Sequence, residues 1–286
     1  METKQSVLIT GASSGIGRAC ALYLDEMGFK VFAGVRKDED KVSLNSETSD
    51  MLEPIILDVT KEDTILEAVE KISNETEYPL FGLVNNAGIG ISGVLEATPV
   101  EEFRKLLEVN VLGLHAVTKA FLPLLRKSRG RIVNIGSSGS FMATPGGGSY
   151  AASKFAVRAI NDSLRLELKP LGMTVSLVAP GAIESSIWDK SKAYKEKLRK
   201  NASPELLEAY KLFIAVGDKM LDYIKPIPAI KVAEVVNHAL TSSKPKRLYL
   251  VGNDAQKAHT LSKFPKWLFD WMVLKHLGEI ATKSRK

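Results

Sequence analysis

Several features that would decide the class of a protein are scarce or missing in this sequence. The chain of 286 residues contains one cysteine, Cys20, so no intrachain disulfide can form. No eighteen apolar residues run together, which argues against a membrane-spanning helix. The first residues lack the charged-then-apolar pattern of a secretory signal. We therefore expect a cytoplasmic protein.

The excess of positive over negative charge is also small. The 39 Lys and Arg residues exceed the 33 Asp and Glu residues by only six, and this excess is spread along the chain. Nucleic-acid binding usually needs a concentrated basic face with aromatic residues or a known motif, and the sequence shows neither. The four histidines lack the spacing of metal ligands. We predict no nucleic-acid partner and no metal site.

The distribution of apolar residues predicts the fold. Short runs rich in Val, Ile and Leu lie at 6–10, 30–35, 54–59, 80–87, 130–137, 174–181 and 246–252. Amphipathic stretches lie between them at 16–27, 62–73, 100–125, 151–168 and 231–242. Apolar strands that alternate with helices are typical of a parallel sheet covered on both faces. We predict an α/β fold, one doubly wound domain of Rossmann type over 1–286.

The first candidate site is the glycine-rich stretch TGASSGIG, which follows the first predicted strand and opens the first helix. A dinucleotide pyrophosphate binds backbone amides at a helix N-terminus, and it needs glycines where a Cβ would block its approach. Gly11, Gly15 and Gly17 satisfy this need, although their spacing differs from the common Gly-x-Gly-x-x-Gly pattern. A purely structural turn remains the alternative for this motif alone.

Six motifs together point to a known family. They are TGASSGIG, NNAG at 85–88, Asn110 within VNVLG, IVNIGSS at 132–138, YAASK at 150–154 and PG at 180–181. In this order they resemble the short-chain dehydrogenase/reductase family, from about residue 6 to residue 252. The resemblance implies interconversion of an alcohol and its carbonyl with a nicotinamide cofactor. The stretches VFAGVRK and YLVG look most like the retinol and 17β-hydroxysteroid dehydrogenase branch.

Tyr150 and Lys154 are the predicted centre of the chemistry. Residues four apart share one face of a helix, so both side chains can point to the same place. A neighbouring ammonium should lower the pKa of the tyrosine toward the range useful for general acid/base catalysis. The alternative is an ordinary tyrosine beside a solvated lysine.

The resemblance implies two further catalytic residues. The family's serine usually lies thirteen positions before the tyrosine, which selects Ser137, and Ser138 remains a rival. Asn110 matches an asparagine that helps to hold a water next to the lysine. A buried asparagine bonded to backbone is its alternative reading.

The resemblance also places the cofactor. Asp58 resembles the acid that receives the adenine amino group, Lys154 would bond the ribose, and Ser185 stands where a threonine is more usual near the carboxamide. The implied cofactor contacts are Thr10, Gly11, Ser13, Ser14, Gly15, Ile16, Gly17, Asp58, Val59, Asn86, Ala87, Gly88, Tyr150, Lys154, Pro180, Gly181, Ile183 and Ser185.

The end of the second predicted strand indicates which cofactor is used. NAD-preferring folds carry an acidic residue there, whereas NADP needs a cation for its extra phosphate. Val35 occupies the acidic position, and Arg36 and Lys37 follow it. Arginine suits a bidentate phosphate contact. We therefore predict NADP(H), with NAD(H) as the alternative and an exposed loop cation as the other reading of Arg36.

Two segments lie outside the regular alternation. Residues 183–226 form a long insertion that we expect to be a helical lid over the substrate. Its apolar residues suit a lipophilic retinoid, steroid or long-chain carbonyl, or equally could pack the lid onto the body. They are Trp188, Tyr194, Leu206, Leu207, Tyr210, Phe213 and Ile214.

Residues 255–286 form an amphipathic C-terminal extension. Its aromatic stretch, 264–278, is too short to span a membrane. It could lie on a membrane surface, although packing on its own domain or on a partner is favoured. The family resemblance implies a homodimer or homotetramer. Against an NADP(H)- or NAD-dependent enzyme stands a non-catalytic NADP(H) sensor or scaffold, which would not need the Ser, Tyr, Lys and Asn set.

Overall fold

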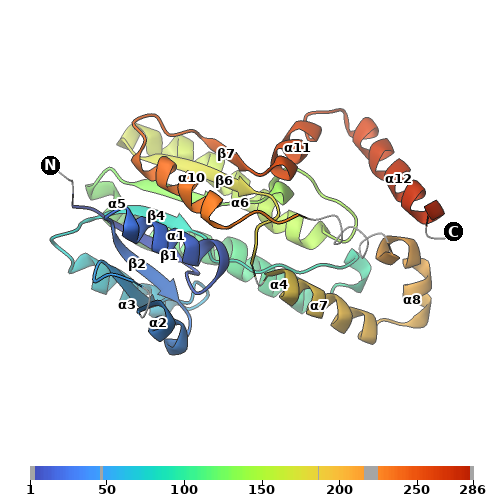
Figure 1. Cartoon of the computed structure of the whole chain (residues 1–286), viewed down its shortest axis with the longest axis horizontal. Helices are drawn as coiled ribbons and strands as arrows, with labels where there is room; N and C mark the ends of the chain where they lie inside the picture. Colours follow the sequence, from blue (N-terminus) through green and yellow to red (C-terminus); the bar gives the residue numbers. More distant parts are fainter. Residues whose placement is uncertain (1–3, 46–47, 186, 216–224, 284–286) are drawn as a thin grey trace.

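A seven-stranded parallel sheet forms the centre of the computed structural model, which describes residues 4–45, 48–185, 187–215 and 225–283 (Figure 1). The spatial order is β3-β2-β1-β4-β5-β6-β7. The strands are β1 (Ser6–Thr10), β2 (Lys30–Val35), β3 (Leu52–Ile56), β4 (Leu80–Asn85), β5 (Arg131–Ile135), β6 (Thr174–Pro180) and β7 (Leu248–Val251). The order reverses between β1 and β4, and such a switch point is where doubly wound sheets bind ligands. The predicted α/β fold is confirmed.

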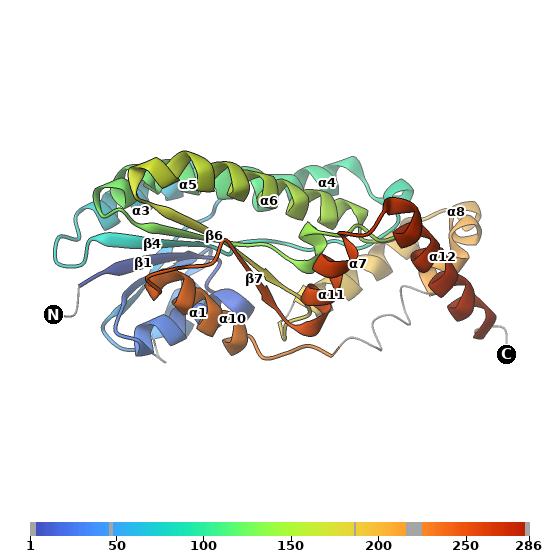
Figure 2. The ribbon, with the colours of Figure 1, turned by 90° about the horizontal axis from the view of Figure 1, so that it is seen from above.

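Helices cover both faces of the sheet. In Figure 2, α1 (Gly15–Glu26) and α10 (Ile230–Thr241) lie on one face, and α3 (Glu62–Ser73), α5 (Leu114–Lys127) and α6 (Gly148–Leu168) lie on the other. The remaining helices with described bounds are α2 (Asp38–Asn45), α4 (Val100–Leu107), α7 (Ile187–Asn201), α8 (Pro204–Ala209), α11 (Asn253–Leu261) and α12 (Lys266–Lys283).

The alternation of side chains along each strand explains why two hydrophobic cores form. Val7 and Ile9 pack in the core under α1 and α10, whereas Leu8 packs in the core under α3 and α5. Successive strand residues point to opposite faces, so a strand that is covered on both sides is apolar at successive positions, as Val7, Leu8 and Ile9 are between the polar ends of β1. All five residues of β1 are buried.

Two buried asparagines interrupt the apolar strands β4 and β5. Asn85 and Asn134 lie side by side on β4 and β5, and Asn85 Nδ2 donates to Asn134 Oδ1 at 2.9 Å and to Thr118 Oγ1 at 2.9 Å. Asn134 Nδ2 donates to Asn161 Oδ1 of α6 at 3.1 Å. All four side chains are buried. Because buried amides must find partners, this network fixes α5 and α6 relative to the sheet.

The helix predicted over 100–125 is not continuous. A π-helical segment, Glu108–Gly113, separates α4 from α5 and contains Asn110. Single π turns inside helices are often found at functional sites. Periodicity could not show this, because one extra residue in a turn barely changes the apolar pattern. Helix α2 was also missed, since its acidic sequence carries little apolar periodicity.

The C-terminal helix α12 extends away from the sheet at the end of the molecule where α7, α8 and α11 also lie (Figures 1 and 2). Trp267 and Trp271 are 71% and 54% exposed. The expectation was packing on its own domain or on a partner; these two side chains do not pack on their own domain, and the partner stays a prediction. Within the part of the chain that the structure describes, no helix is long and apolar enough to cross a membrane. Residues 284–286 of the predicted extension lie outside the described residues.

The two-sided core makes a testable prediction about stability. Phe121 is fully buried between α5 and the sheet. Its replacement by alanine should lower the free energy of unfolding by about 3–5 kcal/mol, because apolar area is lost and a cavity is left. Urea unfolding measures this loss. As a control, Val42→Ala on the exposed face of α2 should change it by about 0.5 kcal/mol or less. Equal losses in the two variants would contradict this assignment of the core.

Candidate active site

The turn between β1 and α1 has little room for side chains at two of its glycines. Gly11 and Gly15 have φ values of +67° and +55°, which favour glycine. A Cβ on Gly11 would lie 2.8 Å from Ala87 Cα, and one on Gly15 would lie 3.0 Å from Ser185 Cβ. Ser14 is the N-cap residue of α1, and its side chain makes no capping hydrogen bond. The first amides of α1 therefore receive no bond from the Ser14 side chain, and a helix N-terminus of this kind, opened by a glycine-rich turn, fits a pyrophosphate.

The turn after β4 is locked against the turn after β1. Thr10 Oγ1 accepts hydrogen bonds from the amides of Asn86 and Ala87, both at 3.0 Å. Asn86 Nδ2 donates to the carbonyl oxygens of Thr10 and Gly11 at 3.0 Å each. A Cβ on Gly17 would lie 2.2 Å from Gly11 O, so the third glycine lets α1 approach this junction. These four polar contacts join the two central strands at the switch point.

The remaining residues assigned to the cofactor lie along the same edge. Arg36 and Lys37 are exposed just after β2. Asp58 and buried Val59 lie after β3, and Asp58 Oδ1 accepts from the amide and the hydroxyl of Thr60 at 3.0 and 2.8 Å. Ser13 and Ile16 are partly buried in the glycine-rich turn, and Gly88 follows β4. Pro180 ends β6, and Gly181, Ile183 and Ser185 follow it.

Ser137 and Tyr150 are brought together by the turn after β5 and the first turn of α6. The Ser137 side chain is close enough to Tyr150 to lower the pKa of its hydroxyl as a hydrogen-bonding neighbour. A Cβ on Gly139 would lie 3.5 Å from the Tyr150 ring and 3.6 Å from Ser137 Oγ, so both side chains border the same small space. Ser137 Oγ also accepts the amide of Gly139 at 3.1 Å, which fixes its rotamer. This geometry supports Ser137 over its rival, Ser138.

Lys154 lies beneath this pair, buried in the protein. Its Nζ donates to the carbonyl oxygen of Ile135 at 2.9 Å and lies 5.8 Å from the centre of the Tyr150 ring. Burial lowers the pKa of Lys154 to about 8. The side chain therefore still carries a proton at pH 7, held close to the phenol.

The expected lowering of the tyrosine pKa is not found in this chain. Burial raises the pKa of Tyr150 above its ordinary value, and the hydrogen bond from Ser137 opposes this rise only in part. Desolvation of the phenolate therefore outweighs the neighbouring cation that the sequence argument relied on. The phenol keeps its proton at neutral pH, as a proton donor must.

Asn110 is anchored by backbone and by α6. Its Oδ1 accepts the amide of Ile89 at 2.8 Å, and its Nδ2 donates to Ile89 O and to Ser153 Oγ, both at 3.0 Å. Ser153 in turn donates to the carbonyl of Tyr150 at 2.7 Å. The side chain thus makes the backbone contacts of the alternative reading, and it also ties the π-helical segment to the helix that carries Tyr150 and Lys154.

Comparison with known proteins agrees with this geometry. A model of the short chain dehydrogenase family matches residues 5–196. The chain belongs to this family. Its fold and its motifs are therefore those of a short-chain dehydrogenase, an oxidoreductase, as the resemblance implied.

Two relatives and one solved structure align with nearly the whole of this chain. Retinol dehydrogenase 7 of Mus musculus is 38% identical over 281 residues, which cover 93% of this chain and 87% of that protein. The 3-amino-tetrahydro-pyrrolizinone reductase of Xenorhabdus hominickii is 38% identical over 274 residues and 91% of each chain. The crystal structure of a short chain dehydrogenase from Burkholderia cenocepacia in complex with NADP is 25% identical, with a TM-score of 0.73 over 96% of this chain and 99% of that one.

The predicted lid of this short-chain dehydrogenase contains α7 and α8. Ser191 Oγ lies 2.8 Å from Ser92 Oγ, and the Tyr210 hydroxyl donates to Glu96 at 2.7 Å, so the lid packs on the loop after β4. Tyr194, Leu206, Leu207, Phe213 and Ile214 are partly buried. Residues 186 and 216–224 and the side chain of Trp188 lie outside the described part of the structure.

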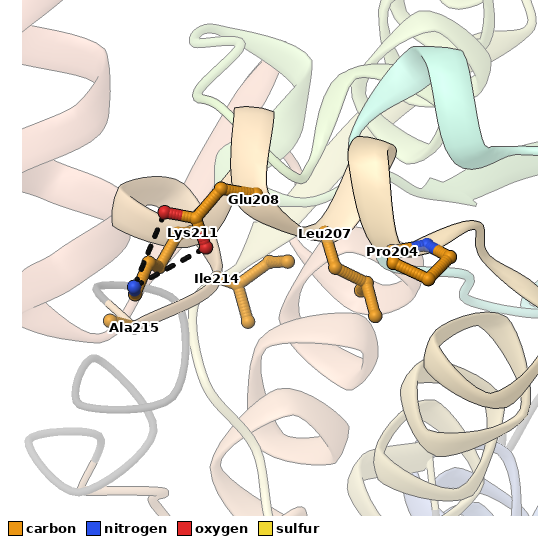
Figure 3. Close-up of a pocket in the computed structure, with 6 residues that line it drawn as sticks. All are labelled: Pro204, Leu207, Glu208, Lys211, Ile214 and Ala215. Atoms are coloured by element: carbon orange, nitrogen blue, oxygen red, sulfur yellow. Dashed lines mark hydrogen bonds and ion pairs between the residues drawn. The ribbon is translucent and has the colours of Figure 1, made fainter.

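A shallow hollow of about 490 Å³ lies on α8 and the helical residues 211–215 that follow it. Figure 3 shows the residues that line it, which are Pro204, Leu207, Glu208, Lys211, Ile214 and Ala215. Glu208 and Lys211 form an ion pair at 3.3 Å within it. Its lining includes neither Ser137, Tyr150 nor Lys154, so this hollow is separate from the chemistry.

Sequence reasoning missed several residues that build the site. Ser153 links Asn110 to Tyr150, and the buried amides of Asn85, Asn134 and Asn161 lie beneath α6. Two of these asparagines interrupt runs that are otherwise apolar, and that exception could have identified them. Asp254 was missed because the backbone amide that it binds, at Ala182, lies far away in the sequence.

The buried Lys154 predicts a pH-dependent stability. The unfolded chain holds the lysine proton up to about its ordinary pKa, whereas the folded chain releases it near pH 8, so the unfolded state binds more protons between these values. The free energy of unfolding of the wild type relative to Lys154→Met should therefore rise with pH across this window, by up to about 1.4 kcal/mol per unit.

Urea unfolding of both proteins at several values between pH 7 and pH 10, without nucleotide, measures this difference. Tyr150 and Cys20 also have a raised pKa, but both proteins contain them, and subtraction removes their contribution. A difference that stays constant with pH would show that Lys154 is not desolvated in the folded state.

Proposed function

We propose that this short-chain dehydrogenase is an NADP(H)-dependent oxidoreductase that interconverts an alcohol and a carbonyl on a lipophilic substrate. The observation that carries the proposal is the joint placement of Ser137, Tyr150 and Lys154 beside a glycine-rich turn that fits a pyrophosphate. Proton transfer and dinucleotide binding therefore share one edge of the sheet.

In carbonyl reduction, Ser137 and Tyr150 act on the substrate oxygen. The Ser137 hydroxyl donates a hydrogen bond to this oxygen and fixes its position. The Tyr150 hydroxyl then gives its proton to the oxygen as negative charge develops there, and alcohol oxidation reverses this transfer. The bound nicotinamide supplies or accepts the hydride. A phenol whose pKa is raised by burial keeps its proton at neutral pH, which suits the reductive direction.

Lys154 and Asn110 support this proton transfer. The ammonium of Lys154 stabilises the phenolate that remains after Tyr150 has lost its proton, and it also binds the ribose hydroxyls. Because Nζ donates a hydrogen bond to Ile135 O, the lysine has a fixed position for both tasks. Asn110 acts through position, since its amide ties the π-helical segment to Ser153. Whether it also holds a water next to Lys154 stays a prediction.

The two exposed cations after β2 support NADP(H). Neither Val35 nor the two residues after it is acidic, so no carboxylate at these positions repels the extra phosphate of NADP. The Burkholderia structure, which covers 96% of this chain, was determined with NADP. Use of NAD(H) is the alternative. Asp58, with one carboxylate oxygen bonded to Thr60, is proposed for the adenine amino group.

An apolar carbonyl or alcohol is the proposed substrate. One relative is named a retinol dehydrogenase and another a reductase of a pyrrolizinone, and both are 38% identical. The partly buried apolar residues of α7, α8 and the helical residues 211–215 favour a lipophilic ligand under residues 183–226. The intact Ser137, Tyr150 and Lys154 set argues against the non-catalytic sensor or scaffold, which would not require it.

A cytoplasmic homodimer or homotetramer is the proposed state of the protein. The exposed tryptophans of α12 give the C-terminal extension an apolar surface that a partner subunit would cover. Contact with a membrane surface is the less favoured alternative for this segment.

Replacement of Tyr150 tests the mechanism. Tyr150→Phe removes the proton donor and keeps the ring, so turnover should fall by a factor of about 10²–10⁴ while NADPH affinity stays the same. The assay follows NADPH oxidation with a panel of retinal, steroid ketones and long-chain aldehydes. Ser137→Ala should lower turnover as well, and Ser138→Ala serves as its matched control. Full turnover in Tyr150→Phe would refute the mechanism, and loss only in Ser138→Ala would exchange the two serines.

Arg36 tests the cofactor. Arg36→Gln removes a charge-assisted contact to the extra phosphate, so it should weaken NADPH binding by about 10- to 100-fold and change NADH binding little. Nicotinamide fluorescence measures both affinities, and Arg126→Gln at the end of α5 controls for the loss of one exposed positive charge. Equal weakening of both cofactors would make Arg36 a general contact, and NADH preference in the wild type would favour the NAD-dependent alternative.

A further inference from the structure

The segment after β6, residues 181–185, is hydrogen-bonded to residues that lie much later in the sequence. The amide of Gly181 donates to Val251 O at 2.9 Å. The amide of Ile227 donates to Ala182 O at 3.0 Å, and the amide of Glu184 donates to Ile227 O at 3.1 Å. This segment contains Ile183 and Ser185, which are proposed cofactor contacts, so its position matters for the site.

One side chain adds a further attachment to this segment. Asp254, in the first turn of α11, accepts the amide of Ala182 through Oδ2 at 2.6 Å. Its Oδ1 accepts the amide of Ala255 at 3.0 Å, which fixes the carboxylate on its own helix. A negative charge is also favourable at a helix N-terminus. The carboxylate thus joins the start of α11 to the end of β6.

Two glycines make room for this carboxylate. A Cβ on Gly181 would lie 1.7 Å from Asp254 Oδ1, and a Cβ on Gly252 would lie 2.7 Å from the same oxygen. An alanine at position 181 would therefore push the Asp254 side chain away and break its bond to Ala182. The absence of a side chain at Gly181 is explained by this contact as well as by any approach of a cofactor.

The other end of α11 contacts the turn that follows Ser137. His259 packs edge-to-face on Phe141, with ring centres 4.8 Å apart. The backbone amide of Phe141 closes this turn by donating a hydrogen bond to Ser138 O at 3.1 Å. The Arg158 guanidinium lies 4.9 Å from the Phe141 ring. Helix α11 therefore touches both the segment that carries Ser185 and the turn that carries the proposed catalytic serine.

We propose that Asp254 is a positioning residue for the cofactor, and that α11 braces the two halves of the site. By holding Ala182, it keeps Ser185 against the glycine-rich turn, where Ser185 Cβ lies 3.0 Å from the position of a Cβ on Gly15. A nicotinamide cofactor then meets a preformed segment and loses less free energy in ordering it. The proposal rests on the proposed function, because it assumes that residues 181–185 cover a dinucleotide.

Hydrogen exchange without nucleotide tests the attachment itself. Asp254→Ala should speed exchange at the amides of residues 182–185, whereas Asp254→Asn, which keeps an acceptor oxygen, should restore much of the protection. Gly181→Ala should speed exchange in the same way, and the double variant should be no faster than either single one, because both remove one contact. The matched control is Asp63→Ala, since Asp63 Oδ1 makes the same first-turn contact, to the amide of Thr64 at 2.8 Å, on α3.

NADPH affinity, followed by nicotinamide fluorescence, tests the consequence. Asp254→Ala should raise the Kd by about tenfold, which corresponds to one hydrogen bond, and Asp63→Ala should leave it unchanged. His259→Ala, at the other end of α11, should lower kcat with little change in Kd, because it releases the turn of Ser137.

Three results would overturn the proposal. Wild-type binding of NADPH together with unchanged exchange and Kd in Asp254→Ala would refute the positioning role and leave the proposed function intact. Additive effects of Gly181→Ala and Asp254→Ala on exchange would show that the two residues do not share one contact. A wild type that binds neither NADPH nor NADH would refute the proposed function and this inference together.

Discussion

The close contact between the turns after β1 and β4 is the constraint on which the site depends. Ala87 leaves no room for a side chain at Gly11, and Gly11 leaves none at Gly17. Because these backbones touch, Thr10 and Asn86 can bond across the junction and fix the two central strands at the point where the strand order reverses. The N-terminus of α1, whose first amides receive no bond from the Ser14 side chain, is thereby held at this junction. A dinucleotide is recognised at such a place through main-chain groups, whose positions do not depend on rotamers.

The proposed proton transfer depends on side chains and not on main-chain groups, and it requires polar side chains inside the protein. Lys154 is only 6% exposed, and its burial is tolerated because Ile135 O accepts a hydrogen bond from its ammonium, while the cost of burial lowers its pKa to about 8. The loss in free energy of unfolding that this burial causes is offset by the surrounding side-chain amides, which hold α6 against β5. Ser153 joins Tyr150 to Asn110, and Asn161 joins α6 to Asn134. Helix α6 is thus held at several turns, and Tyr150 and Lys154 keep their relation to each other and to Ser137.

Sequence reasoning predicted those parts of the protein that repeat a local pattern. Strands β1 and β2 and helix α3 have the predicted bounds, because apolar alternation and periodicity alone determine them. The motifs placed Ser137, Tyr150 and Lys154 in one family pattern, and their side chains are neighbours in the structure. What failed depended on contacts between distant segments. The pKa of Tyr150 was predicted from one charged neighbour, whereas its direction is set by burial among many groups. The π-helical segment at Asn110 and the contact of Asp254 with Ala182 have no local signal either.

The division of labour along the chain explains why the activity class is easier to infer than the substrate. The family match covers residues 5–196, which contain the glycine-rich turn, Ser137, Tyr150 and Lys154. Most of the C-terminal part, with α8, α10, α11 and α12, lies beyond the match. The residues proposed for proton transfer and dinucleotide binding lie before position 196, and such residues can be the same in relatives that act on different molecules. In the proposed function, the lid and α11 would shape the space above the nicotinamide. Substrate choice would then depend on loops and helices that pack on a shared sheet, and it could diverge while the sheet and the proposed catalytic residues stay the same.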